Sequence, residues 1–166
     1  MGTISVFDAR AAIHKAMLQL VNNAVDGKPA IGAAVLSLQD NFFVPELEND
    51  LSASWPALRL VKAEIPYLIL IDKNPHRRVL GTLFKALHGK EISRGSSSKV
   101  VARDLLLSFS RLGYVFLIDF AERIDSQSID FLVNPEVKTP CILLGRSDRL
   151  WPKLASLNGS VNRFSY

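Results

Sequence analysis

The sequence has one cysteine, few aromatic residues and no long apolar run among its 166 residues. The single cysteine, Cys141, excludes a fold held together by disulfides, because a disulfide needs a second thiol. The longest apolar stretches, such as Ile65–Ile71, are far shorter than the roughly 20 residues that a membrane-spanning helix needs. The N-terminal residues also lack the pattern of a signal peptide. These absences predict a cytoplasmic protein that does not enter a membrane.

Charge and histidine content restrict the function classes further. Twenty basic against sixteen acidic side chains give a net charge of +4, which permits contact with nucleic acid but does not require it. The three histidines, His14, His76 and His88, show no metal-ligand spacing, so no metal site is predicted. A hydrophobic content of 48% excludes disorder, and the length suits one domain over residues 1–166.

Four short, almost wholly apolar runs are predicted to be strands. Continuous hydrophobicity over about 4–8 residues is typical of strands covered on both faces, as in parallel sheets. The predicted strands are Ala30–Leu38, Ile65–Ile71, Tyr114–Ile118 and Cys141–Leu144.

Helices are predicted between these strands from apolar residues at helical spacing, with capping residues and glycines at their ends. The predicted helices are Asp8–Val25, Leu51–Ala63, Pro75–Leu87 and Ser97 or Ser98 to Leu112, with shorter ones after Ser126 and Asp148. Because strands alternate with helices, the sequence predicts an α/β fold: a three-layer sandwich with a mainly parallel central sheet.

Polar residues follow three of the predicted strands. Asp72 and Asp119 each follow an apolar run directly, and Ser147 lies shortly after the fourth strand. Ligands of open parallel sheets bind outside the carboxyl ends of the strands, so these residues are expected to share one edge. A carboxylate there is suited to holding Mg²⁺, and a small polar residue to orienting a phosphate or a water molecule.

Two segments around these residues resemble motifs of AAA+ ATPases. Tyr114–Ile124 resembles a Walker B strand, four apolar residues followed by Asp-Glu, and Thr139–Leu150 resembles the next strand with its sensor-1 turn. Val161–Phe164 is similar to the segment that often carries an arginine finger, here Arg163. The order and spacing most resemble the transposition-associated ATPases of the TniB and MuB kind. The resemblance implies a P-loop NTPase-like core with strand order 5-1-4-3-2, and implies Asp119, Ser147 and Arg163 as nucleotide-site residues. The family's helical lid is not expected in a chain ending at Tyr166.

The sequence departs from this family at the residues that hold and hydrolyse ATP. No Gly-x-x-x-x-Gly-Lys-Ser/Thr motif, the Walker A loop that surrounds phosphates with backbone N–H groups, occurs in the chain. After Ala30–Leu38, where the family places that loop, the sequence has no glycine before Glu46. The Walker B glutamate is replaced by Phe120, and Glu122 is positioned to substitute for it only if the backbone turns unusually. The sequence therefore predicts a degenerate AAA+ domain without catalysis and without a bound cofactor.

A group of basic residues lies along the predicted helix Pro75–Leu87 and in the polar loop after it. Such a strip is able to contact phosphates, although the pattern is more typical of the solvated charged face of an amphipathic helix. The candidate nucleic-acid-binding residues are Arg77, Arg78, Lys85, Lys90 and Arg94.

These patterns predict a non-catalytic AAA+-like module that acts by assembly with a protein partner or with copies of itself. The setting that the resemblance implies is a mobile-element or other DNA-transaction system, with DNA contact as a further option. One alternative is a nucleotide-binding regulator or weak NTPase that uses ATP and Mg²⁺ through an unconventional loop at Leu38–Val44. Another is a plain α/β interaction domain whose likeness to ATPases is convergent, which a different strand order would favour.

Overall fold

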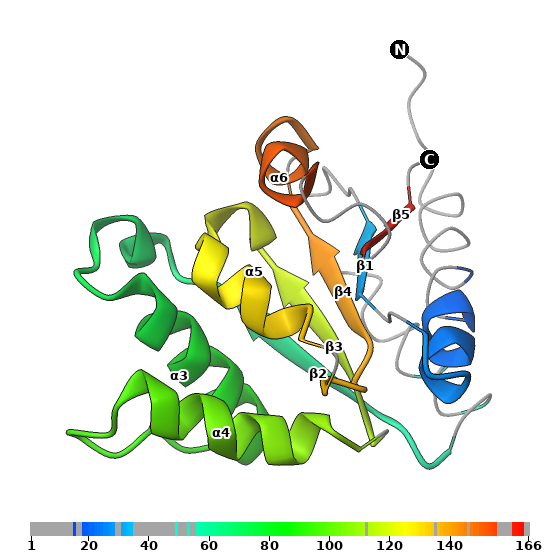
Figure 1. The fold of residues 1–166 in the computed structure, drawn as a ribbon, viewed down its shortest axis with the longest axis horizontal. Coiled ribbons are helices and arrows are strands. Elements are labelled where there is room, and N and C mark those ends of the chain that lie inside the picture. Colours follow the sequence, from blue (N-terminus) through cyan, green and yellow to red (C-terminus); the bar gives the residue numbers. More distant parts are fainter. Residues whose placement is uncertain are drawn as a thin grey trace.

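A parallel sheet organises the computed structural model of this chain (Figure 1). The structure describes residues 15, 18–28, 31–34, 49, 53, 56–111, 113–134, 136–145, 147–155 and 161–164. Within these residues the sheet has five strands in the order β2-β3-β4-β1-β5, and every neighbouring pair is parallel. The strands are β1 (Ile31–Ala34), β2 (Arg59–Glu64), β3 (Tyr114–Asp119), β4 (Cys141–Leu144) and β5 (Val161–Phe164). Read from β5, this is the order 5-1-4-3-2, so the predicted order is confirmed.

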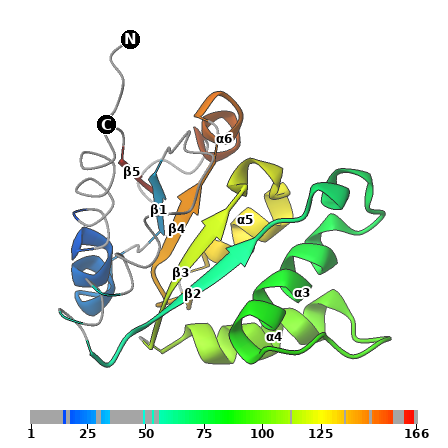
Figure 2. The same cartoon turned by 180° about the vertical axis from the view of Figure 1, so that it is seen from behind.

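Helices alternate with these strands, as the sequence predicts. They are α3 (Pro75–His88), α4 (Ser98–Phe109), α5 (Ser126–Leu132) and α6 (Ser147–Leu154), with short 3-10 helices η1 (Tyr67–Ile71) and η2 (Ala121–Arg123). Residues 18–25 form a further helix at the opposite end of the molecule from α3 (Figures 1 and 2). The described residues contain no helix with the length and apolar character needed to cross a membrane.

Capping residues explain where the central helices begin and end. The side chains of Asn74, Ser97 and Asp125 accept hydrogen bonds from the N–H groups of Arg77, Val100 and Ser128, and these bonds satisfy donors at the starts of α3, α4 and α5. Helix α3 ends at Gly89, whose φ of 73° is the left-handed conformation that favours glycine. These helix positions agree with the predicted ones.

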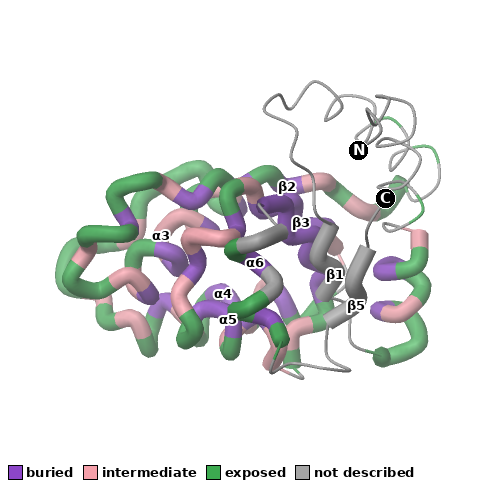
Figure 3. The backbone as a smooth tube through the Cα atoms, turned by 90° about the horizontal axis from the view of Figure 1, so that it is seen from above, coloured by how far each residue is buried: buried purple, intermediate pink, exposed green. Residues whose placement is uncertain are grey.

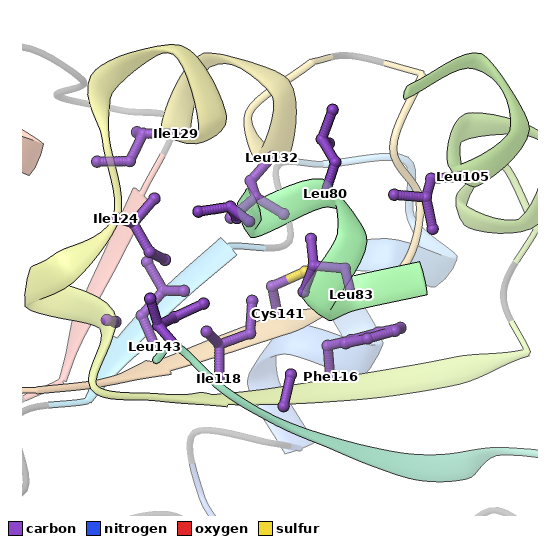
Figure 4. Close-up of a cluster of buried hydrophobic side chains, with 14 of the residues drawn as sticks. Leu80, Leu83, Leu105, Phe116, Ile118, Ile124, Ile129, Leu132, Cys141 and Leu143 are labelled. Atoms are coloured by element: carbon purple, nitrogen blue, oxygen red, sulfur yellow. The ribbon is translucent and has the colours of Figure 1, made fainter. Parts of the chain in front are cut away.

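The sheet is buried on both faces. Phe116, Ile118, Cys141 and Leu143 belong to the cluster that α3, α4 and α5 cover (Figure 4). Their strand neighbours Val115, Leu117 and Ile142 point the other way and are also fully buried. Figure 3 shows the buried positions gathered along β2 and β3 and on the inner sides of the helices. Burial on both faces explains why β3 and β4 are continuously apolar in the sequence.

The second strand lies earlier in the chain than the sequence predicts. The strand expected at Ile65–Ile71 is wrong, because residues 67–71 form η1 and β2 is Arg59–Glu64. The helix expected over Leu51–Ala63 is wrong at its C-terminal end, because Arg59–Ala63 belong to β2. As an edge strand, β2 alternates exposed charged residues with buried Val61 and Ala63, so it lacks the continuous apolar pattern that identified β3 and β4.

The outer parts of the sheet agree with the sequence in part. β1 confirms the core of the strand predicted at Ala30–Leu38, and the remainder of that prediction lies outside the described residues. The start of the helix predicted from Asp8 also lies outside them. β5 pairs in parallel with β1 and was not predicted as a strand.

Candidate functional site at the carboxyl edge of the sheet

Two acidic residues lie at neighbouring positions where β2 and β3 end. Glu64 is paired with Asp119 in the register of these strands. Asp119 is half-buried, and its Oδ1 atom accepts a hydrogen bond of 2.8 Å from the N–H of Phe120. This edge is where an open parallel sheet binds its ligands.

The chain turns sharply directly after Asp119. Phe120 has φ 57° and ψ 39°, the left-handed conformation that a residue with a side chain rarely adopts. The turn leads straight into η2 and brings Arg123 back over Phe120, with the guanidinium carbon 4.3 Å from the ring centroid. An aromatic ring stacked under an arginine therefore occupies the position directly after the Walker B-like aspartate.

Arg123 also connects this turn to the loop after β2. Its Nη1 atom donates a hydrogen bond of 3.0 Å to the carbonyl of Ile65, and its guanidinium carbon lies 5.2 Å from the ring centroid of Tyr67. Cation–π contacts of this kind are worth about 0.5–1 kcal/mol at exposed sites. One arginine thus holds together the segments that follow two neighbouring strands.

The turn carries Glu122 to the end of β4. Its Oε2 atom is buried and accepts no hydrogen bond from any residue that the structure describes. A Cβ atom on Gly145 would lie 2.5 Å from this oxygen and 3.1 Å from the backbone nitrogen of Glu122. Glycine at position 145 is therefore what allows the Glu122 carboxylate to lie against the main chain after β4.

Lys153 fixes the same turn from α6. Its Nζ atom donates hydrogen bonds to the carbonyls of Glu122 and Ile124, the second at 2.9 Å. Burial lowers the pKa of the Lys153 ammonium, while the carboxylates of Asp125 and Glu122 oppose that shift by favouring the charged form. The Lys153 ammonium thus donates hydrogen bonds to the backbone of the turn and also interacts electrostatically with the carboxylates of Glu122 and Asp125.

The nucleotide-site candidates lie at different distances from this turn. Ser147 is the first residue of α6, which follows β4, so Ser147 and Asp119 lie after neighbouring strands. Arg163 lies on β5 in register with Ala33, and β4 and β1 separate its strand from β3. The fold therefore brings Asp119 and Ser147 to one part of the edge and places Arg163 at the far side of the sheet. Sequence reasoning missed the contributions of Arg123 and Lys153, for which the sequence carries no motif.

Asp72 does not lie at a strand end, so its predicted placement is wrong. It follows η1 and accepts hydrogen bonds from the N–H of Asn74 at 2.8 Å and from Nε of Arg78 at 3.0 Å. These two hydrogen bonds hold the pKa of the Asp72 carboxyl below its usual value. Its contacts stabilise the segment that enters α3.

The five predicted nucleic-acid-binding residues fall into two groups. Arg77, Arg78 and Lys85 line a groove of about 810 Å³ beside β2. Carboxylates line the groove too: Arg78 pairs with Asp72, and Lys85 pairs with Glu91 at 2.8 Å. The other two residues, Lys90 and Arg94, are exposed on the loop between α3 and α4 and form no ion pair with a described residue.

Comparison with known proteins gives matches in structure alone. No model of a protein family matches the sequence, and a comparison with curated proteins finds no significant match. The ORC2 protein of Aeropyrum pernix, solved in ADPNP–ADP complexes, aligns with a TM-score of 0.59 and 11% identity over 93% of this chain and 47% of that chain. The Drosophila ORC, solved bound to AT-rich DNA and Cdc6, aligns with a TM-score of 0.53 and 9% identity over 95% of this chain and 56% of that chain.

The likeness to these two structures supports an AAA+-like α/β fold for this chain. The chain spans about half the length of the two proteins. At 11% and 9% identity the likeness establishes the fold, and the activity must be argued from the site itself.

Proposed function

We propose that this chain is a degenerate AAA+-like module that does not hydrolyse ATP and acts by protein–protein assembly in a DNA-transaction system. A mobile-element system is the specific setting that the motif order favours. The observation that carries the proposal is the turn after β3, where Phe120 takes the place of a catalytic glutamate. The absence of a Walker A motif from the sequence adds to it.

The geometry of the turn bears on whether Glu122 replaces the missing glutamate. The backbone does turn unusually, at Phe120, but the turn directs the Glu122 carboxylate against Gly145 instead of leaving it free beside Asp119. Loss of a residue that activates the attacking water costs about 10²–10⁴-fold in rate. Loss of the loop that surrounds the phosphates removes most of the nucleotide affinity as well.

Isothermal titration with ATP and Mg²⁺ is the direct test. We expect no saturable binding up to millimolar nucleotide and no phosphate release above the protein-free rate. Micromolar binding accompanied by turnover would contradict the proposal.

A nucleotide-binding regulator or weak NTPase is the second candidate, favoured by the placement of Asp119 and Ser147 after neighbouring strands. In that function Asp119 would hold Mg²⁺ and Ser147 would orient a phosphate or water. The unconventional phosphate loop that it needs, Leu38–Val44, lies outside the described residues. If ATP does bind, unchanged affinity in an Asp119→Ala variant would eliminate this candidate.

The proposal also includes contact with DNA. We expect substitutions in the two groups of basic residues to change DNA affinity by different amounts. Replacing Lys90 and Arg94 by alanine should weaken binding to duplex DNA and lower the salt dependence by about one unit of slope for each phosphate that is no longer neutralised. Replacing Arg78 and Lys85 by alanine removes the same number of charges and should change binding less, because these two side chains are already paired with Asp72 and Glu91. The measurement is fluorescence anisotropy of a labelled duplex at several salt concentrations. Equal effects in both variants would argue against an interface centred on this loop.

A further inference from the structure

The outer edge of β2 presents backbone groups that no described strand pairs with. β2 lies at the end of the sheet and pairs only with β3 among the described strands (Figure 2). The N–H groups of Arg59 and Ile65 donate to the carbonyls of Gly113 and Asp119 on the β3 side. Because backbone directions alternate along a strand, Leu60, Lys62 and Glu64 direct their N–H and C=O groups to the open side.

Space for another strand lies next to this edge. The groove of about 810 Å³ has Lys62, Ala63 and Glu64 on its β2 side. Helix α3 forms the opposite side, where the small residues Gly81 and Ala86 lie among the long side chains of Arg77, Arg78 and Lys85. An added strand would thus meet hydrogen-bonding groups of β2 that no described strand uses.

The charges on this edge alternate in sign. Lys62 Nζ and Glu64 Oε1 are 3.3 Å apart, and both side chains are partly exposed. Charges of a single sign would protect an edge strand against pairing with a copy of itself. A lysine and a glutamate two residues apart are instead complementary to the same sequence running in the opposite direction.

We propose that β2 pairs in antiparallel orientation with β2 of a second copy of this chain, about a two-fold axis at Ala63. In this register Lys62 lies opposite Glu64 of the partner subunit, and Glu64 lies opposite Lys62 of the partner subunit. Each of these two residue pairs exchanges two backbone hydrogen bonds, so the two sheets become one continuous sheet. The same surface is used on both copies, so the assembly closes as a dimer.

Charge selects this register over its neighbours. An axis at Lys62 would place two lysines directly opposite each other, which is unfavourable. An axis at Val61 would set Lys62 opposite Leu60, leaving both charges of the edge without a charged partner. Ala63 is also the smallest residue of β2, and it suits an axis where the two backbones approach most closely. The dimer goes beyond the proposed function, because it does not depend on the nucleotide or DNA properties of the chain.

Charge reversal in four combinations tests the dimer. In Lys62→Glu, glutamates face one another at both pairs, and in Glu64→Lys, lysines do. Each single variant should therefore dimerise about tenfold or more weakly than the original chain in analytical ultracentrifugation. An equimolar mixture of the two variants restores opposite charges at both pairs and should form a heterodimer. The double variant Lys62→Glu with Glu64→Lys should dimerise like the original chain.

The controls separate pairing from folding. Both single variants disrupt the same ion pair within the chain, so a folding defect would not be repaired by mixing them. Circular dichroism checks that each variant is folded, and Arg103→Glu reverses an exposed charge on α4 that does not line the groove and should leave the dimer intact. A monomeric original chain, as expected if this edge instead binds a peptide from another protein, would overturn the proposal. Single variants that dimerise as strongly as the original would overturn it too.

Discussion

Replacing Leu105 by alanine should lower the free energy of unfolding by about 3–5 kcal/mol. Leu105 lies on the inner side of α4, is fully buried and belongs to the cluster between the helices and the sheet (Figure 4). The substitution removes buried apolar surface and leaves a cavity that the dense surroundings only partly fill. Urea unfolding followed by circular dichroism measures the loss.

The chain supplies a matched control on the same helix. Leu107 is two residues further along α4 and is 68% exposed. Leu107→Ala removes the same atoms from a leucine that is mostly in water, and we expect a change within about 0.5 kcal/mol. Similar losses from both substitutions would show that α4 does not present the face to the sheet that the structure gives it.

Alkaline pH should destabilise the protein through Cys141. The thiol is fully buried in β4, and burial raises the pKa of Cys141 from 9.0 to about 12. Above pH 9 the unfolded chain therefore loses the thiol proton while the folded chain keeps it, so unfolding becomes easier as pH rises. Between about pH 8 and pH 11 this linkage removes about 2.5 kcal/mol of stability.

Comparison with Cys141→Ala isolates this contribution, because lysine and tyrosine titrations occur in both proteins. At about pH 8 the original chain should be the more stable, since the alanine variant lacks the buried sulfur. The difference in unfolding free energy between the two should then shrink by about 2.5 kcal/mol as the pH reaches about 11. A constant difference over this range would mean that the Cys141 thiol titrates as it does in the unfolded chain.

The buried centre of the fold could be predicted from the sequence, and its edge could not. β3 and β4 are covered on both faces, so they are continuously apolar and short, and Gly89 and the capping residues mark helices clearly. β2 has one neighbour and carries Lys62 and Glu64, so its pattern did not identify a strand. The apolar run after β2 was wrongly predicted to be a buried strand. Its hydrophobic residues lie on η1 and are 58–80% exposed: Tyr67, Leu68, Leu70 and Ile71.

The candidate site likewise has one residue that the sequence predicted and others whose placement it could not predict. Asp119 was found because it follows an unmistakable strand, and the parallel sheet fixed which edge it occupies. The placement of Glu122 depends on the left-handed backbone of Phe120 and on Gly145, which lies 23 positions later. No local pattern encodes a contact between two such distant turns. The ion pairs that divide the five basic residues likewise depend on packing that the sequence alone does not give.

The strand order has a consequence for how a nascent chain folds. Ile31 of β1 pairs with Cys141 and with Val161, which are 110 and 130 positions later, whereas Arg59 of β2 pairs with Tyr114, 55 positions later. Closing longer loops costs more entropy, and residues leave the ribosome in sequence order. We expect β2 and β3 to come together first with α3 and α4. β1 is synthesised before these elements, but it cannot pair with β4 or β5 until translation has passed β4.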